Sequence, residues 1–267
     1  MPGPAARALL ELLQVMARLR DPQQGCPWDL AQDFASIAPH TLEEAFEVAD
    51  AIERGEPDAI RDELGDLLFQ VVFHARLGEE RGWFDFAAVA GGITAKLRRR
   101  HPHVFATAGQ QERPGAGAPV ADWERIKAAE RGAAGEVGTL QGIALALPAL
   151  TRAAKLGKRA SRVGFDWPDA AGVRDKVHEE LAEVDEVLAA EAPAARRAEE
   201  LGDLLFAIAN WSRHLGIDAE SALRTANQKF ERRFAIMEAL ARERGLALES
   251  LSAVAWDALW VEAKRGG

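Results

Sequence analysis

The heptapeptide ELGDLLF occurs twice in this chain of 267 residues, at residues 63–69 and again at residues 200–206. Other landmarks keep the same order around both copies. A turn with Trp and Asp comes first, then an acidic stretch, the heptapeptide, a basic stretch and a Trp followed four residues later by Lys. Several landmarks in register indicate a tandem duplication. We therefore predict two copies of one unit, over residues 1–130 and 138–267.

Helical spacing of apolar residues dominates both copies, and alternating β-branched runs are nearly missing. This pattern predicts an all-α protein in which each copy is a helical bundle with one acidic antiparallel helix hairpin. The Gly- and Pro-rich stretch 106–120 is typical of a loop, and we expect a helix containing Trp123 to end the first copy.

Composition argues against several classes of function. The formal net charge of -9 disfavours a broad nucleic-acid surface, so we expect no nucleic-acid partner. No apolar run reaches about 18 residues, so we expect no membrane span. Cys26 has no second cysteine for an intramolecular disulfide, which fits a cytoplasmic location.

Acidic residues of the first copy are spaced to share one face of two neighbouring helices. Residues three apart lie on the same side of an α-helix, so Glu44 is beside Glu47, and Glu63 is beside Asp66. Both cross-helix pairs are equidistant from Gly55, so an antiparallel hairpin brings them to one level. The second copy repeats this symmetry with Glu180, Glu183, Glu200 and Asp203.

A solvated acidic face is the ordinary explanation for such residues, because Glu is a good helix former. Here, however, apolar residues such as Val48 and Leu204 flank the acids, and unpaired charge is costly beside an apolar stripe. Carboxylates at one level also repel each other unless a cation lies among them. Oxygen ligands without thiolates suit Mg²⁺, with Mn²⁺ as the alternative. We predict one such ion site in each copy.

A di-iron bundle is the competing interpretation, since it also uses acids on facing helices. It normally needs Glu-x-x-His pairs, and no histidine follows these acids at that spacing. His74 shares the face of Glu63 two to three turns along, where a packed or hydrogen-bonded role is the ordinary one. Redox chemistry is therefore disfavoured.

Basic residues of the second copy match a ligand that carries phosphates. Lys229 and Arg233 share one helix face, a spacing that recurs in the first copy, and Lys176 precedes Glu180 by one turn. Mg²⁺ held by carboxylates is often completed by substrate phosphates. Trp260 fits either stacking on a base or packing of the last helix, and its residue type alone favours packing.

The chain resembles the MazG nucleoside triphosphate pyrophosphohydrolases over nearly its whole length. The first half carries the resemblance in the runs GCPWDLAQ, LEEAFEV, DELGDLLFQVVFHA and RRRHPHVF. The second half carries it in RAAKLGKRASRVGFDWP, EELAEV, ELGDLLFAIAN, ANQKFERRF and ALWVEAK. The resemblance implies Mg²⁺-dependent hydrolysis of nucleoside triphosphates to the monophosphate and pyrophosphate, by a homodimer.

The resemblance also implies roles for individual residues. Metal ligands are expected at Glu44, Glu47, Glu63, Asp66, Glu180, Glu183, Glu200 and Asp203. We assign catalysis to the second set of these acids together with Lys229. Nucleotide contacts are expected from Lys176, Glu179, Glu180, Lys229, Arg233 and Trp260.

The two halves differ at positions that matter for a nucleotide. The first half has His40 where the second has Lys176, and Thr94 where the second has Asn227. We therefore expect the second half to carry most of the turnover, while the first is active, weakly active or regulatory.

The mechanistic hypothesis is hydrolysis at the α-phosphorus by water whose pKa the metal lowers, with the basic residues stabilising phosphate oxygens. A general-base role for Glu179 or Glu180 stays open. Two alternatives also stay open: a nucleotide- or metal-binding interaction protein that does not hydrolyse its ligand, and a relative specific for one phosphorylated nucleotide such as phosphoribosyl-ATP.

Overall fold

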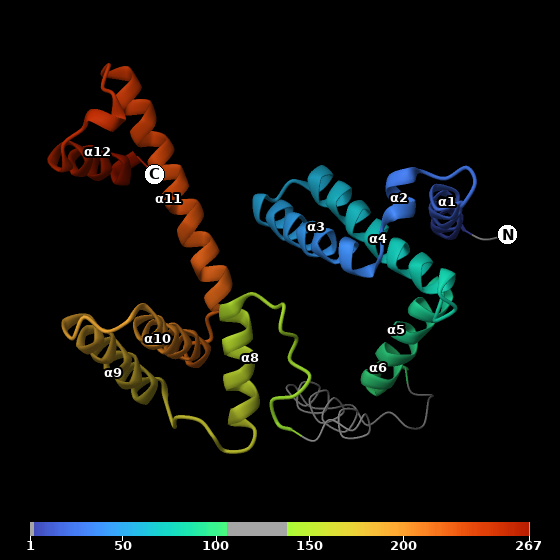
Figure 1. The fold of residues 1–267 in the computed structure, drawn as a ribbon, viewed down its shortest axis with the longest axis horizontal. Helices are drawn as coiled ribbons and strands as arrows, with labels where there is room; N and C mark the ends of the chain where they lie inside the picture. Colours follow the sequence, from blue (N-terminus) through green and yellow to red (C-terminus); the bar gives the residue numbers. More distant parts are fainter. Residues whose placement is uncertain (1–2, 106–137, 267) are drawn as a thin grey trace. The chain divides into compact units, whose positions relative to one another are not determined.

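The structure is a computed structural model that describes residues 3–105 and 138–266 (Figure 1). It divides the chain into two compact units, Met1–Ala129 and Glu130–Gly267. Within the described residues both units are helical and contain no strand, so the all-α prediction is confirmed. The loop predicted over 106–120 and the helix predicted around Trp123 lie outside the described residues.

Unit 1 is built around a long helical hairpin. Its helices are α1 (Pro4–Leu19), α2 (Pro27–Ala31), α3 (Phe34–Arg54), α4 (Pro57–Glu80), α5 (Phe86–Arg100) and α6 (Pro102–Phe105). Asp33 starts α3 because its side chain accepts hydrogen bonds from the backbone N–H groups of Ala35 and Ser36. Gly55 ends α3 in the left-handed conformation (φ 72°), and Pro57 opens α4. The predicted turn therefore lies where the acid spacing requires it.

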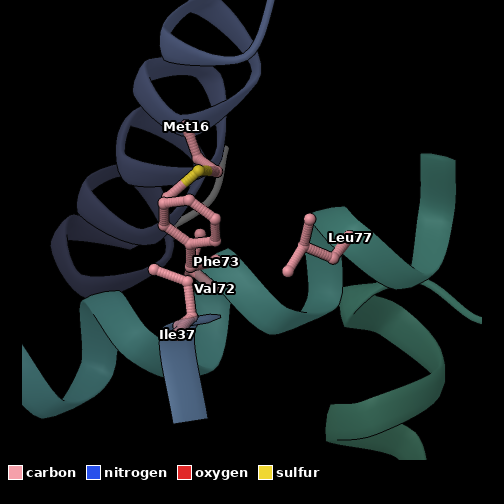
Figure 2. Close-up of a cluster of buried hydrophobic side chains, with 5 residues drawn as sticks. All are labelled: Met16, Ile37, Val72, Phe73 and Leu77. Carbon is pink, nitrogen blue, oxygen red and sulfur yellow. The ribbon is translucent and has the colours of Figure 1, made fainter. Parts of the chain in front are cut away.

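The core of unit 1 joins α1 to this hairpin. Met16, Ile37, Val72, Phe73 and Leu77 form its buried cluster (Figure 2). Figure 2 shows Met16 of α1 lying against Phe73 of α4. Beside this cluster, buried Arg20 binds the carboxylate of Glu80 with both Nε (3.0 Å) and Nη2 (2.7 Å). This bidentate pair fixes the end of α1 to the end of α4.

Unit 2 repeats the hairpin, and two further long helices follow it. Its helices are α8 (Ala149–Ser161), α9 (Ala170–Ala189), α10 (Ala194–His214), α11 (Ala219–Glu243), the short 3₁₀ turn η1 (Leu248–Ser250) and α12 (Ala253–Gly266). Asp169 starts α9 by accepting a hydrogen bond from the N–H of Gly172. The turn to α10 contains Glu191 at a φ of 50°. Each unit thus holds one acidic antiparallel hairpin, as predicted.

Close packing positions the α9–α10 hairpin on the rest of unit 2. Helix α8 packs against α10 at Gly157, where an added Cβ would overlap the side-chain oxygen of buried Asn210. The last two helices share a separate core of Met237, Ala241, Leu259 and Ala263. No described helix combines the length and the apolar character that crossing a membrane requires.

Candidate metal and nucleotide site

The hairpin of unit 1 gathers three carboxylates. Glu44, Glu47 and Glu63 each offer an oxygen, and these oxygens lie within 4.8 Å of one another. Asp66 is exposed and outside this group of three. It still acts on the cluster, because burial, followed by the charges of Asp66 and Glu47, raises the pKa of Glu44. The hairpin therefore concentrates negative charge at one level.

The hairpin of unit 2 gathers a more deeply buried set. Oxygens of Glu180, Glu200 and Asp203 lie within 4.8 Å of one another. Glu180 and Glu200 are only 6% and 4% exposed. The fourth predicted acid, Glu183, is outside this group, although desolvation and the charge of Glu180 raise its pKa. Each hairpin thus brings together three of its four predicted acids, and the acid left out differs between the units.

Basic side chains already contact the acids of unit 2. Lys176 Nζ lies 2.7 Å from Glu180 Oε1 and 2.8 Å from Glu179 Oε1. These two carboxylates raise the pKa of Lys176, with Glu179 contributing most. Lys176 therefore stays charged beside the cluster, where a phosphate can replace a carboxylate as its partner.

Arg196 contacts the acid cluster, and the sequence analysis did not select it. Its Nη2 lies 2.5 Å from Glu200 Oε1. The available clue was spacing, because Arg196 precedes Glu200 by four residues, as Lys176 precedes Glu180. Each buried glutamate of the cluster thus has one cation a helical turn away.

The donor set of unit 2 fits a divalent cation. Glu180 Oε2 is buried and has no hydrogen-bond partner. A buried carboxylate oxygen without a partner is costly, and a hard cation would satisfy it. Three carboxylates without a nearby thiolate are the ligands that Mg²⁺ and Mn²⁺ prefer.

The other predicted nucleotide contacts lie on α11 and α12. Lys229 is exposed on α11, and Arg233 is half-buried with its Nε buried and unpartnered. Trp260 packs against Phe230 with ring centroids 5.5 Å apart. Both rings line an apolar cavity of about 320 Å³ together with Phe234, Met237, Trp256 and Asp257. Within the described residues no ion pair joins Lys229 or Arg233 to the acid cluster.

His74 has ordinary structural partners. Its Nε2 lies 2.9 Å from Thr41 Oγ1, and its ring stacks on Phe34 with centroids 5.5 Å apart. Burial lowers its pKa, so the neutral ring is favoured.

Comparison with known proteins places both hairpins in one family. Residues 32–105 and 171–235 match the MazG nucleotide pyrophosphohydrolase domain. The chain belongs to the MazG family. Because both matched MazG segments contain one acidic hairpin, the predicted duplication is confirmed together with the family. The MazG match ends before α12, so it does not include Trp260.

Relatives match this MazG chain over nearly its full length. It is 49% identical to the nucleoside triphosphate pyrophosphohydrolase of Escherichia coli strain K12, over 95% of this chain and 96% of that protein. It is 43% identical to the nucleoside triphosphate pyrophosphohydrolase/pyrophosphatase MazG of Thermotoga maritima, over 96% and 95% of the two chains. The Bacillus subtilis protein YabN is 41% identical over 94% of this chain but only 50% of its own length.

Proposed function

We propose that this chain is a nucleoside triphosphate pyrophosphohydrolase that converts a nucleoside triphosphate and water into the monophosphate and pyrophosphate. The observation that carries the proposal is the buried carboxylate cluster of the α9–α10 hairpin, with its unpartnered Glu180 oxygen. Membership of the MazG family and the names of the two full-length relatives support the same reaction.

Mg²⁺ is the proposed ion, and Mn²⁺ is the alternative. Glu180, Glu183, Glu200 and Asp203 would hold it in unit 2, and Glu44, Glu47, Glu63 and Asp66 would hold it in unit 1. When bound, such an ion neutralises phosphate charge and lowers the pKa of water.

The protein's own side chains bind and orient the triphosphate. Lys176 is anchored beside the acids by Glu179 and Glu180, so its ammonium is positioned for a phosphate oxygen at that end of the cluster. Lys229 and Arg233 add positive charge for the remaining phosphates, and Trp260 offers a ring face to the base. The roles of Lys229 and Arg233 rest on their shared helix face and on the family resemblance, and the role of Trp260 rests on the resemblance.

The active form is proposed to be a homodimer. Each hairpin exposes a matched apolar row, formed by Leu64, Leu68 and Val71 on α4 and by Leu201, Leu205 and Ile208 on α10. Their spacing of four and three residues places each row on one helix face. A second copy of this chain would cover such rows as helices do in a four-helix bundle. The expected cytoplasmic location remains part of this proposal.

Unit 2 is proposed to carry most of the turnover, because Lys176 has His40 as its counterpart in unit 1. The carboxylates of unit 1 are nevertheless gathered, so a role in activity or regulation is retained for it.

A product assay tests the proposed reaction. The intact protein is incubated with Mg²⁺ and each common nucleoside or deoxynucleoside triphosphate, and pyrophosphate and nucleotide products are quantified. We expect one pyrophosphate per monophosphate and a loss of both products when EDTA removes the ion. Release of orthophosphate with a diphosphate, or binding without any product, would contradict the proposal and favour another phosphatase or a nucleotide-binding protein.

A further inference from the structure

We propose that the two acid clusters take up their divalent cation in different ways. The cluster of unit 1 binds the cation without a nucleotide, whereas the cluster of unit 2 binds it tightly only together with a polyphosphate. This inference rests on the proposed function in one respect, namely that both clusters are cation sites.

In unit 2, resident cations already neutralise the most buried acids. Lys176 pairs with Glu180 and Arg196 pairs with Glu200, at 2.7 and 2.5 Å. The side chains of Glu180 and Glu200 are 8% and 6% exposed, whereas those of Lys176 and Arg196 are 31% and 55% exposed, so the carboxylates are shielded from water and the cations meet it. Each cation is shared with an exposed neighbour, Glu179 or Glu199, so a free divalent cation approaches carboxylates whose charge is partly compensated.

In unit 1, both cations are replaced. The shared heptapeptide aligns Ala59 with Arg196, since each precedes the first glutamate of ELGDLLF by four residues. His40 stands where Lys176 does, four residues before the first acid of its cluster, and its ring lies 3.4 Å from Glu43. Within residues 3–105 no lysine or arginine forms an ion pair with Glu44, Glu47, Glu63 or Asp66.

An independent feature of α4 also points to a cation or an ordered donor at this face. Gln70 is only 4% exposed, and its Oε1 is buried without a hydrogen-bond partner. It lies one turn beyond Asp66 and two turns beyond Glu63, on the same helix face. Ala207 occupies the matching position in unit 2. The acid face of unit 1 thus gains an unpaired oxygen acceptor where unit 2 has a methyl group.

The difference in charge sets the order of binding. Bare carboxylates attract a free divalent cation at long and short range, while a neighbouring fixed cation repels it. A polyphosphate favours cation binding in unit 2, because its negative charge can pair with Lys176 and Arg196. The carboxylates are then free to bind the metal. We expect nucleotide-free affinity to be at least about tenfold higher at unit 1 than at unit 2.

Binding of Mn²⁺ to the intact protein without nucleotide tests the order directly, with free Mn²⁺ measured by electron paramagnetic resonance. Glu63→Gln in unit 1 should weaken the tightest site by about tenfold or more, and Glu200→Gln in unit 2 should leave it unchanged. The proposal is overturned if Glu200→Gln removes the tightest site, if both variants weaken it equally, or if no nucleotide-free binding occurs.

Exchanging the cations between the units provides the reciprocal test. Ala59→Arg should weaken nucleotide-free Mn²⁺ binding to unit 1 by about tenfold, and Arg196→Ala should create a second nucleotide-free site. Arg197→Ala is the matched control, because Arg197 is exposed on α10 and makes no ion pair with the cluster. If Ala59→Arg does not fold by circular dichroism, His40→Lys takes its place. Unchanged Mn²⁺ binding in the folded exchange variants contradicts the proposal.

Adding the non-hydrolysable α,β-methylene analogue of ATP completes the design, because it should raise Mn²⁺ binding at unit 2 by about tenfold or more. Failure of the loading order is distinguishable from failure of the reaction. Pyrophosphate release combined with equal nucleotide-free binding at both clusters overturns the loading order alone. The expected loading order without pyrophosphate release overturns the proposed reaction alone.

Discussion

Asp166 connects the loop before α9 to the end of α10 through its side chain. Its carboxylate accepts hydrogen bonds from Arg213 Nη2 at 2.6 Å and Nη1 at 2.9 Å, and His214 Nε2 lies 2.9 Å from it. Arg213, more than His214, holds the pKa of Asp166 well below its ordinary range. Because the loop leads directly into the helix that carries Glu180, this charge network supports the geometry of the site.

Replacing Asp166 with Asn should lower the free energy of unfolding by about 2 kcal/mol at pH 7, since it removes a bidentate charged pair. The pKa of Asp166 is lower in the folded protein than in the unfolded protein, where it is about 3.9. The charged pair therefore stabilises the fold fully above this pH, and the stabilisation is lost as the pH falls below it. The difference between Asp166→Asn and wild type should therefore shrink between pH 5 and pH 2, by urea unfolding followed by circular dichroism.

Asp185→Asn is the matched control, because Asp185 is exposed on α9 and makes no ion pair among the described residues. It should leave stability within about 0.5 kcal/mol of wild type at every pH. A difference for Asp166→Asn that stays constant down to pH 2 would show that charge is not the cause.

At the residue scale, the sequence predicted the acids better than their partners. Helix spacing fixes which carboxylates share a face, so Glu180 and Glu200 were found without coordinates. Arg196 was missed because an arginine four residues before a glutamate is common on solvated helices, and only burial of Glu200 makes this pair matter. Burial depends on packing of α8, α9 and α10, which spacing along one helix does not contain.

At the element scale, the two hairpins turn with different residues in the left-handed region. Gly55 adopts a φ of 72° in unit 1, and Glu191 adopts a φ of 50° in unit 2. A Cβ at Gly55 would meet no atom within 4 Å, so its cost is conformational alone. The two turns therefore form a matched pair for measuring backbone strain.

Gly55→Ala should destabilise unit 1 by about 1 kcal/mol, because residues other than glycine are strained at positive φ. Glu191→Gly should stabilise unit 2 by about 0.5 kcal/mol, since relief of strain exceeds the added entropy of the unfolded chain only slightly. Thermal unfolding of both variants checks the signs, and the same sign for both would contradict the explanation.

The sequence predicted the acidic hairpins, but it did not predict where α11 and α12 lie relative to them. Mirror spacing of the acids about Gly55 located the first hairpin, because the turn residue and the acids agreed. No comparable spacing pattern in the sequence relates residues of α11 and α12 to the acids. Lys229 and Arg233 were selected by their shared helix face and by the resemblance, and Trp260 by the resemblance; no ion pair joins Lys229 or Arg233 to the cluster within the described residues. Spacing along one helix relates only the residues of that helix, so it does not place α11 and α12 relative to the acids.

At the scale of the whole molecule, the exposed apolar rows on α4 and α10 predict association. Leu68 and Leu205 occupy matching positions and are 41% and 48% exposed. The double variant Leu68→Glu and Leu205→Glu should convert the proposed dimer to a monomer, because charge would be buried in the proposed interface. Sedimentation equilibrium of the purified proteins measures the change.

Val254→Glu is the control for that variant, since Val254 is 80% exposed on α12 and outside both rows. It should remain dimeric. A monomeric wild type, or a double variant that stays dimeric, would refute the assignment of these rows to the interface.

The rate of pyrophosphate release by paired variants of the intact chain tests the central claim most directly. Glu180→Gln removes a charge from the buried cluster of unit 2, and Glu44→Gln makes the same change in unit 1. We predict that Glu180→Gln lowers kcat by about a hundredfold or more while circular dichroism stays native, and that Glu44→Gln keeps most of the activity. A folded Glu180→Gln protein with undiminished turnover, or a greater loss in Glu44→Gln, would contradict the account.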